Sequence, residues 1–165
     1  MDLAGFNAAP AEEAEAALLD CCASPRWAQV VAGQRPYRSV DALYEAADVA
    51  LASLGDEDLD AALAGHPRIG ERAGAGQAAS SGREQAGVAQ SSTATRDALV
   101  DGNRDYEARF GHVYLVCASG RTGDELLAML RDRLGNDPGT EWAVTRAELG
   151  KINRLRLARL IGGDE

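Results

Sequence analysis

Residues 66–85, which read HPRIGERAGAGQAASSGREQ, interrupt a chain whose other segments carry apolar residues at helical spacing. The interruption begins at His66, because the proline after it disfavours helical dihedrals. Glycines and small residues follow as far as Ser80, where the pattern predicts that helix resumes. The stretch also holds one of only two histidines. We therefore expect the flanking helices to close a pocket over it.

Composition places the chain among ordinary globular proteins. Its 165 residues fit one domain, with 45% hydrophobic and 26% charged residues. The net charge of −9 argues against a nucleic-acid partner, because proteins that bind phosphate backbones carry basic faces. The longest apolar run is too short to cross a bilayer, so no membrane partner is expected.

Cysteine usage predicts a cytoplasmic protein. Cys21, Cys22 and Cys117 are odd in number and two of them are adjacent, which suits reduced thiols better than disulfides. Neither a CxxC nor an HExxH spacing occurs, so no metal site is expected.

The apolar spacing and the capping residues predict an all-α fold. We expect a single compact domain over residues 1–165, with seven or eight helices and one short extended segment near 113–118. The β-branched, apolar sequence VYLVCA, without helical period, indicates that extended segment. The expected helices cover residues 7–22, 25–33, 39–55, 56–64, 81–100, 103–110, 122–134 and 140–161.

His66 has two interpretations. It can be a half-exposed loop histidine, the commoner role for this residue type. It can also be an acid/base group that titrates near neutrality and projects from a loop fixed by Pro67. His112, just after a predicted helix end, is expected to have a structural or surface role.

The sequence from Ser81 to Glu84 has the spacing of a capping box, in which serine and glutamate satisfy each other's backbone N–H groups. Ser80 offers a second cap, which would leave Ser81 or Glu84 available for a ligand. A helix start also collects unpaired N–H groups that favour an anion. A capping role and a substrate-binding role therefore both remain open.

Arg156 falls on the apolar face of the last predicted helix, four residues after Ile152 and four before Leu160. A buried arginine needs an anionic partner, because an unpaired buried charge is costly. The arginine can reach the rim of the protein, pair with an acidic side chain, or hold an anionic ligand with its guanidinium fork.

The 114–118 segment raises a question of backbone hydrogen bonding. A lone extended segment has no sheet partner, so its N–H and C=O groups must pair elsewhere. A packed connector with helix or water partners would satisfy them. A heterocycle with alternating donors and acceptors would satisfy them too.

Taken in order, these segments resemble the OHCU decarboxylases, which act on 2-oxo-4-hydroxy-4-carboxy-5-ureidoimidazoline in urate degradation. The resemblance covers nearly the whole chain, and the order of its motifs is more specific than any one of them. Val113 departs from a proline of many members, and Arg68 from an acidic residue. The motifs are GQRPY at 33–37, GHPRIG at 65–70, SSGREQAG at 80–87, YEARFG at 106–111 followed by VYLVCA, and ELGKINRLRL at 148–157.

The resemblance implies a carboxy-lyase that needs no cofactor, adopts an all-helical fold and commonly forms homodimers. Its product would be (S)-allantoin. His66 and Glu84 would be catalytic. The resemblance implies substrate contacts from Pro67, Ser81, Gly82, Arg83, Gln85, Arg156 and the backbone of Tyr114, Leu115, Val116, Cys117 and Ala118.

Two other classes of function are compatible with some of these residues. A helical interaction module would use Ser81 and Glu84 only as a cap and Arg156 only in an ion pair. A metal-dependent ureide hydrolase would use His66 with acidic residues, but no second histidine lies at ligand spacing.

Overall fold

A computed structural model describes residues 1–71 and 82–162. Within these ranges the chain forms nine α-helices and no β-strand, which confirms the all-α class. Residues 113–118 are not helical, as predicted. The chain divides into two compact units. Unit 1 comprises Met1–Ala62 with Gly150–Glu165, and unit 2 comprises Leu63–Leu149.

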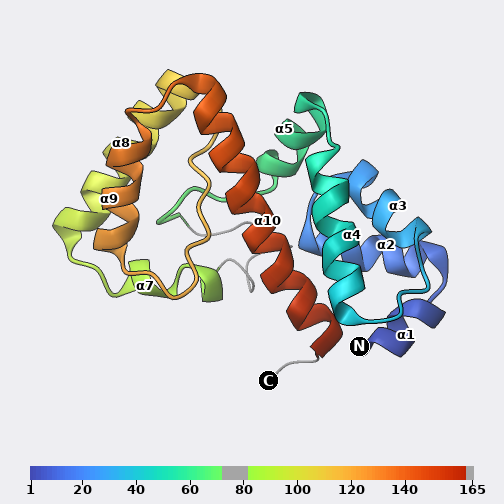
Figure 1. The fold of residues 1–165 in the computed structure, drawn as a ribbon. Helices are drawn as coiled ribbons and strands as arrows, with labels where there is room; N and C mark the ends of the chain where they lie inside the picture. Colours follow the sequence, from blue (N-terminus) through green and yellow to red (C-terminus); the bar gives the residue numbers. More distant parts are fainter. Residues whose placement is uncertain (72–81, 163–165) are drawn as a thin grey trace. The chain divides into compact units, whose positions relative to one another are not determined.

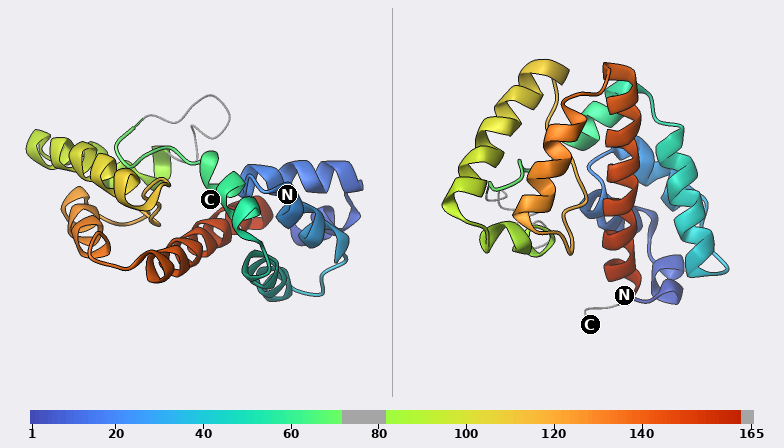
Figure 2. Two further views of the ribbon diagram at one scale, coloured as in Figure 1. Left: turned by 90° about the horizontal axis from the view of Figure 1, so that it is seen from above. Right: turned by 60° about the vertical axis from the view of Figure 1, so that its left-hand side comes forward.

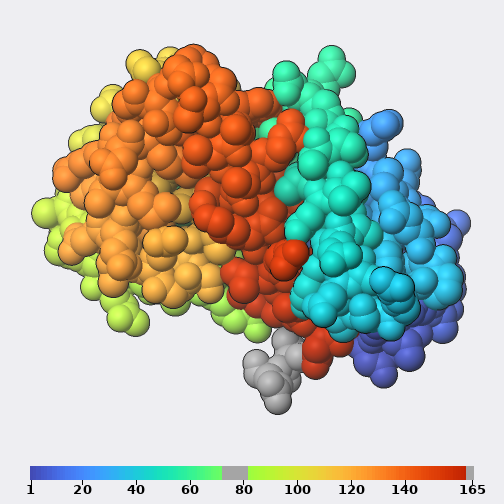
Figure 3. Space-filling view, viewed as in Figure 1, coloured from blue at the N-terminus to red at the C-terminus, as the bar shows by residue number. Residues whose placement is uncertain are grey.

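Unit 1 is a helical cluster in which α2 packs on α3 and α3 packs on α4 (Figure 1). Trp27 of α3 is fully buried and donates its indole N–H to the Ala47 carbonyl of α4 at 2.9 Å. Figure 3 shows α4 covering one face of this unit. Its helices are α1 (Leu3–Ala8), α2 (Ala11–Cys21), α3 (Pro25–Gly33), α4 (Val40–Ala52), most of α5 (Asp56–Ala64) and the C-terminal part of α10 (Pro138–Gly162).

The GQRPY motif packs within unit 1. The Arg35 guanidinium donates to the carbonyls of Phe6 at 2.7 Å and Ala9 at 2.9 Å. Asn7 and Tyr37 exchange a pair of hydrogen bonds, each 2.8 Å long. These contacts satisfy carbonyls at the end of α1 that the helix itself leaves without partners. The motif therefore fastens α1 to the α3–α4 connection.

Unit 2 is built around α8 and α9, which lie side by side and run in the same direction (Figures 1 and 2). Gly102 permits their close approach, because a Cβ there would lie 2.5 Å from a Leu130 methyl group. Unit 2 contains the end of α5 (Asp56–Ala64), then α7 (Ala86–Ala89), α8 (Thr93–Phe110), α9 (Gly123–Arg133) and the N-terminal part of α10. Its core includes Ile69, Val88, Leu99, Tyr106, Tyr114, Val116, Leu126 and Leu130.

The expected helix starts near residues 25, 39 and 122 are confirmed. The side chains of Ser24, Ser39 and Thr122 cap these helices, each accepting a hydrogen bond from the backbone N–H three residues later. The expected single helix over 7–22 is wrong, because Pro10 lies between α1 and α2. The helix expected from residue 140 begins instead at Pro138. The Asp137 carboxylate caps it by accepting from the Thr140 N–H at 3.0 Å.

The prediction of one helix over 81–100 and another from 103 is also wrong. The break lies at residues 90–92, where the Ser92 hydroxyl accepts from the Thr95 N–H at 3.1 Å and starts α8. Serine competes well for this position because its side chain replaces a missing backbone acceptor. Gly102 then lies inside α8, where its packing against Leu130 offsets the usual cost of glycine in a helix.

Candidate functional site

His66 lies in unit 2, just beyond the end of α5. Its backbone N–H donates to the Leu63 carbonyl at 2.9 Å, which closes the last turn before the loop. The residue lies outside the helices, as Pro67 predicts. Its side chain is half-buried and the Nε2 atom is shielded from solvent. The imidazole is therefore held in a defined environment rather than on a free surface.

The 66–70 loop is fastened by side chains from two other elements. Gln85 accepts from the Gly70 N–H at 2.8 Å and donates to the Arg68 carbonyl at 3.4 Å. Asn103 of α8 is 3% exposed and donates to the Ile69 carbonyl at 3.1 Å. Gly70 has φ +92°, a conformation that favours glycine. The GHPRIG and SSGREQAG motifs thus meet directly through Gln85.

Arg68, one of the two departures from the family pattern, has acidic partners on the outside of the loop. Its guanidinium contacts both carboxylate oxygens of Glu107 on α8, at 2.5 and 3.0 Å. Glu71 lies 3.4 Å from it. Hydrogen bonds to Glu107 and Glu71 raise the pKa of Arg68. The arginine therefore ties the loop to α8.

The segment after residue 81 supplies Glu84 from a helical turn over 82–84. Glu84 is 8% exposed, whereas Gly82 and Arg83 face solvent. Ser80 and Ser81, and with them the predicted capping box, lie outside the described residues. The burial of Glu84 means that its carboxylate is directed inward rather than into water.

Gly87 brings this segment against the turn that follows the extended segment. A Cβ at Gly87 would lie 2.0 Å from the Arg121 carbonyl oxygen, a distance that no side chain could accept. Only glycine allows the two backbones to come so close. Glu84 and Gln85 come shortly before Gly87 in the sequence. They therefore lie close to the turn that follows the 114–118 segment.

The 114–118 segment is packed inside unit 2. Tyr114, Leu115, Val116 and Ala118 are buried, and Cys117 is half-buried. The Leu115 carbonyl accepts from Arg133 at 2.7 Å, and the Cys117 N–H donates to Glu148 at 2.8 Å. Buried side chains from α9 and α10 thus supply part of the pairing that a sheet would otherwise provide.

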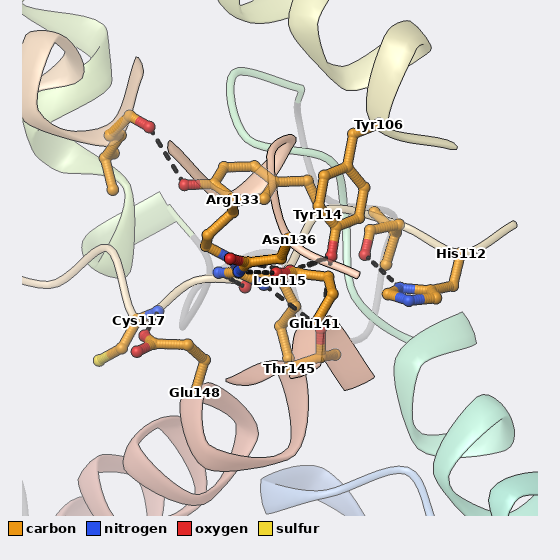
Figure 4. A network of polar contacts seen from close by, with 12 residues as sticks. Tyr106, His112, Tyr114, Leu115, Cys117, Arg133, Asn136, Glu141, Thr145 and Glu148 are labelled. Carbon is orange, nitrogen blue, oxygen red and sulfur yellow. Dashed lines mark hydrogen bonds and ion pairs between the residues drawn. The ribbon is translucent and has the colours of Figure 1, made fainter. Parts of the chain in front are cut away.

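Sequence reasoning missed this polar cluster, which Figure 4 shows. The Arg133 guanidinium pairs with Glu141 at 2.5 Å, and their side chains are 7% and 0% exposed. The Tyr106 hydroxyl donates a short hydrogen bond to the same carboxylate. The signal was present: Glu141, Thr145 and Glu148 recur at spacings of four and three, on one face of α10.

The cluster perturbs the titration of its members. Burial raises the pKa of Tyr106 to about 12, and its hydrogen bond to Glu141 acts in the same direction. Burial also raises the pKa of Tyr114, although the nearby Arg133 opposes that shift. Burial alone would lower the pKa of Arg133, but Glu141 outweighs it and the pKa is raised. Arg133 therefore stays charged throughout the neutral range.

Arg156 belongs to unit 1 and is 4% exposed. The prediction that it lies on a buried face is confirmed, and the alternative that it reaches the rim is wrong. Its guanidinium donates to the Cys21 carbonyl at 3.2 Å. Burial raises the pKa of the Cys21 thiol to about 12, so this cysteine is neutral beside the arginine.

Of the two roles expected for His112, structural or surface, its ring contacts support the structural one. Its ring lies 4.8 Å from Trp142 and 5.5 Å from Tyr106, within the aromatic cluster of unit 2. Among the described residues, no group of three His, Cys, Asp or Glu side chains is arranged to hold a metal. In the same part of the chain, no helix has the length and apolar character needed to span a membrane.

Comparison with known families gives one consistent match. The family model described as OHCU decarboxylase matches residues 7–158. The chain is 31% identical over 145 residues to the uric acid degradation bifunctional protein TTL of Arabidopsis thaliana, covering 85% of this chain and 45% of that protein. It is 27% identical over 135 residues to the 2-oxo-4-hydroxy-4-carboxy-5-ureidoimidazoline decarboxylase of Haloferax volcanii, covering 82% and 80%.

A solved structure supports the same match. The chain resembles an OHCU decarboxylase crystallised in the presence of (S)-allantoin, with a TM-score of 0.77 and 30% identity, covering 93% of this chain and 99% of that one. The decarboxylase of Amia calva is 39% identical over 59 residues, 36% of this chain and 34% of that protein. The matched part of the chain thus spans less than half the length of the Arabidopsis and Amia proteins.

Proposed function

We propose that this chain, which belongs to the OHCU decarboxylase family, converts 2-oxo-4-hydroxy-4-carboxy-5-ureidoimidazoline to (S)-allantoin. The reaction breaks the bond between the ring carbon and its carboxylate and releases CO₂. The electron pair left on the ring carbon delocalises into the adjacent imidazoline C=N, as in an enamine. A proton then adds from one face to the neighbouring ring carbon, which bears the ureido group, while the hydroxyl on the first carbon loses its proton and becomes a carbonyl. No cofactor is needed as an electron sink in this scheme.

The main support for the proposal is one observation in unit 2. Gln85 bonds to the backbone of the 66–70 loop, so two of the family motifs meet through a side chain of one of them. Catalysis of this kind depends on fixed placement of the acid/base group. A histidine on a loop that three separate side chains hold meets that requirement better than a histidine on a free loop.

His66 is assigned the general acid/base role, because imidazole is the side chain best matched to proton transfer near neutral pH. Glu84 would orient His66 or the substrate hydroxyl, and its burial supports an inward role. Arg156, assigned by its motif, would stabilise negative charge on a carboxylate or carbonyl group of the substrate.

The remaining family positions would bind the ureidoimidazoline. Ser81 and Gln85 would hydrogen-bond the ureido group or the ring amides. Gln85 already uses both ends of its amide on the loop, so its contact with substrate would require exchange of one of those bonds. Further contacts are proposed for Pro67, Gly82, Arg83 and the backbone of residues 114–118.

We also propose a cytoplasmic homodimer in which residues 1–165 act as one domain. The family model supports the domain proposal because it covers residues 7–158 without interruption and so includes parts of both units. The three cysteines are not in disulfides, which is compatible with a reducing compartment.

The activity can be tested directly on the unstable intermediate. Uricase and hydroxyisourate hydrolase generate it in the cuvette, and addition of this protein should accelerate the loss of its absorbance. The product should be optically active allantoin. Decay at the spontaneous rate, with racemic product, would disprove the proposed function.

His66→Ala tests the assignment of the acid/base group. Loss of one general acid/base group typically slows a reaction by about 10²–10⁴-fold, and we expect a fall in kcat of that size. The helical circular dichroism should not change. His112→Ala is the comparison variant, because it also removes an imidazole from unit 2 but from its aromatic cluster. A variant His66→Ala that keeps its activity would remove this residue from the mechanism.

A further inference from the structure

We infer that Arg133 and Glu148 are positioning residues for the 114–118 segment, holding one edge of its backbone so that the other edge can bind the substrate. The inference rests on the proposed function, in which this segment contacts the ureidoimidazoline. Neither residue would touch a reacting atom. Their role would be to fix the backbone groups that do contact the substrate.

The two contacts fall on the same edge of the segment. Arg133 donates to the Leu115 carbonyl at 2.7 Å, and Glu148 accepts from the Cys117 N–H at 2.8 Å. In an extended chain the N–H and C=O groups of residues two apart point to the same side, and those of the residue between point to the opposite side. Arg133 of α9 and Glu148 of α10 therefore satisfy backbone groups on the same edge of the segment.

Val116 lies between Leu115 and Cys117, so its backbone groups point to the opposite edge of the segment. Its N–H and C=O make no hydrogen bond with the described part of the chain, although the residue is only 3% exposed. Unpaired buried backbone groups are rare, because each costs free energy comparable to a lost hydrogen bond. A ureido or ring amide offers a matching acceptor and donor. The edge opposite Arg133 and Glu148 is thus the edge suited to the substrate.

Arg133 is itself held by several partners, as Figure 4 shows. Its Nε donates to Glu141 at 2.7 Å, and its guanidinium lies 4.8 Å from the centre of the Tyr114 ring. The planar fork lets one arginine reach a carboxylate and a carbonyl at the same time. The backbone and the aromatic side chain of the same segment are therefore both fixed by one buried cation.

A backbone held in this way is preorganised for its ligand. Substrate binding then does not have to order the segment, and the cost of that ordering does not reduce the affinity. Removal of Glu148 should loosen Cys117 and its neighbour Val116 without altering any acid/base group. The expected signature is weaker binding with little change in the chemical step.

The experiment compares Glu148→Ala with Glu148→Gln in the intact protein. We expect Glu148→Ala to raise KM by about tenfold and to leave kcat nearly unchanged, because uniform binding is lost. Glu148→Gln should recover most of that loss, because its amide oxygen still accepts from the Cys117 N–H. Asp105→Ala and Asp105→Asn are matched controls on the exposed face of α8.

Two further measurements separate positioning from general damage. Amide hydrogen exchange at Cys117 should accelerate in Glu148→Ala and less so in Glu148→Gln. The dissociation constant of (S)-allantoin, used as the probe, should rise in parallel with KM. If Glu148→Ala does not fold, Arg133→Lys makes the same test from the other contact, with exposed Arg131→Lys as its control.

The outcomes distinguish this inference from the proposed function. Faster exchange at Cys117 with unchanged KM and unchanged allantoin binding would overturn the positioning role, while the decarboxylase activity stands. A fall in kcat with constant KM would overturn it as well. If the wild-type protein does not accelerate the decay, the proposed function fails, and allantoin binding and hydrogen exchange still report on the segment.

Discussion

The 66–70 loop and the 114–118 segment are two non-helical parts of unit 2 that are held by different kinds of side chain. The loop relies partly on Arg68 and Glu107, whose side chains are 48% and 29% exposed. The segment relies on Arg133 and Glu141, whose side chains are 7% and 0% exposed. Both use charged partners, but only the segment keeps its partners away from water.

This difference in exposure determines how much each pair matters. An exposed ion pair gains little, because water and salt screen it and two long side chains must be ordered. A buried pair has little net effect when intact, but loss of one partner leaves an uncompensated charge at high cost. The segment should therefore respond strongly to mutation of its partners, and the loop weakly.

The largest effect is expected for Glu141→Ala. The change leaves Arg133 buried without its carboxylate and removes the acceptor of the Tyr106 hydroxyl. Breaking a buried pair in this way costs about 3–5 kcal/mol of the free energy of unfolding. Urea denaturation followed by circular dichroism measures the loss. Glu45→Ala on the exposed side of α4 is the matched control.

A loss below about 1 kcal/mol for Glu141→Ala would mean that the pair behaves like a surface pair. The contrast between the two regions would then be wrong. A large loss at Glu45 as well would show that the assay reports on helix stability in general rather than on the buried pair.

An intermediate effect is expected at alkaline pH. The pKa of Tyr106 is about 12 in the folded protein, compared with 10.0 for the free side chain. The folded state therefore holds this proton more tightly than the unfolded state. The resulting stability is fully present below pH 10 and is lost as the pH rises towards 12. The loss from this group is on the order of 2 kcal/mol.

Tyr106→Phe isolates that contribution. The variant should be less stable at neutral pH, because Glu141 loses a donor, yet its stability should fall less between pH 10 and 12. Urea denaturation at a series of pH values gives both quantities. Tyr44→Phe, on the half-exposed side of α4, serves as the comparison. Identical alkaline slopes for wild type and Tyr106→Phe would show that Tyr106 does not titrate as described.

The loop was largely predictable from sequence, whereas the partners of the segment were not. Pro67 restricts its neighbour whatever the tertiary structure, so the non-helical state of His66 could be predicted. The pairing of Arg133 with Glu141 depends on the meeting of α9 and α10, which no local pattern specifies. The helix starts at Ser24 and Thr122 could be predicted for the same reason, because a capping side chain acts on residues close to it in the sequence.

The helix break before α8 shows where local rules compete. Gly102 and Ser92 are both plausible interruptions, and the expected break was placed near the glycine. In the structure the helix continues through Gly102, because Leu130 fills the space that its missing side chain leaves. Arg156 is the opposite case: its position on an apolar face predicted its burial, but the Cys21 carbonyl as acceptor could not be predicted. Periodicity gives the direction of a side chain and not its partner.

The smallest effect is expected for Arg68→Gln. Glu107 and Glu71 lose their cation, but Gln85 and Asn103 still hold the loop backbone. The melting temperature should fall slightly at low salt and match wild type near 0.5 M NaCl, because screening already removes the pair there. Arg104→Gln, which breaks another exposed pair of α8, is the control. A large, salt-independent loss would show that the loop depends on Arg68 as the segment depends on Arg133, and that exposure does not set the difference between them.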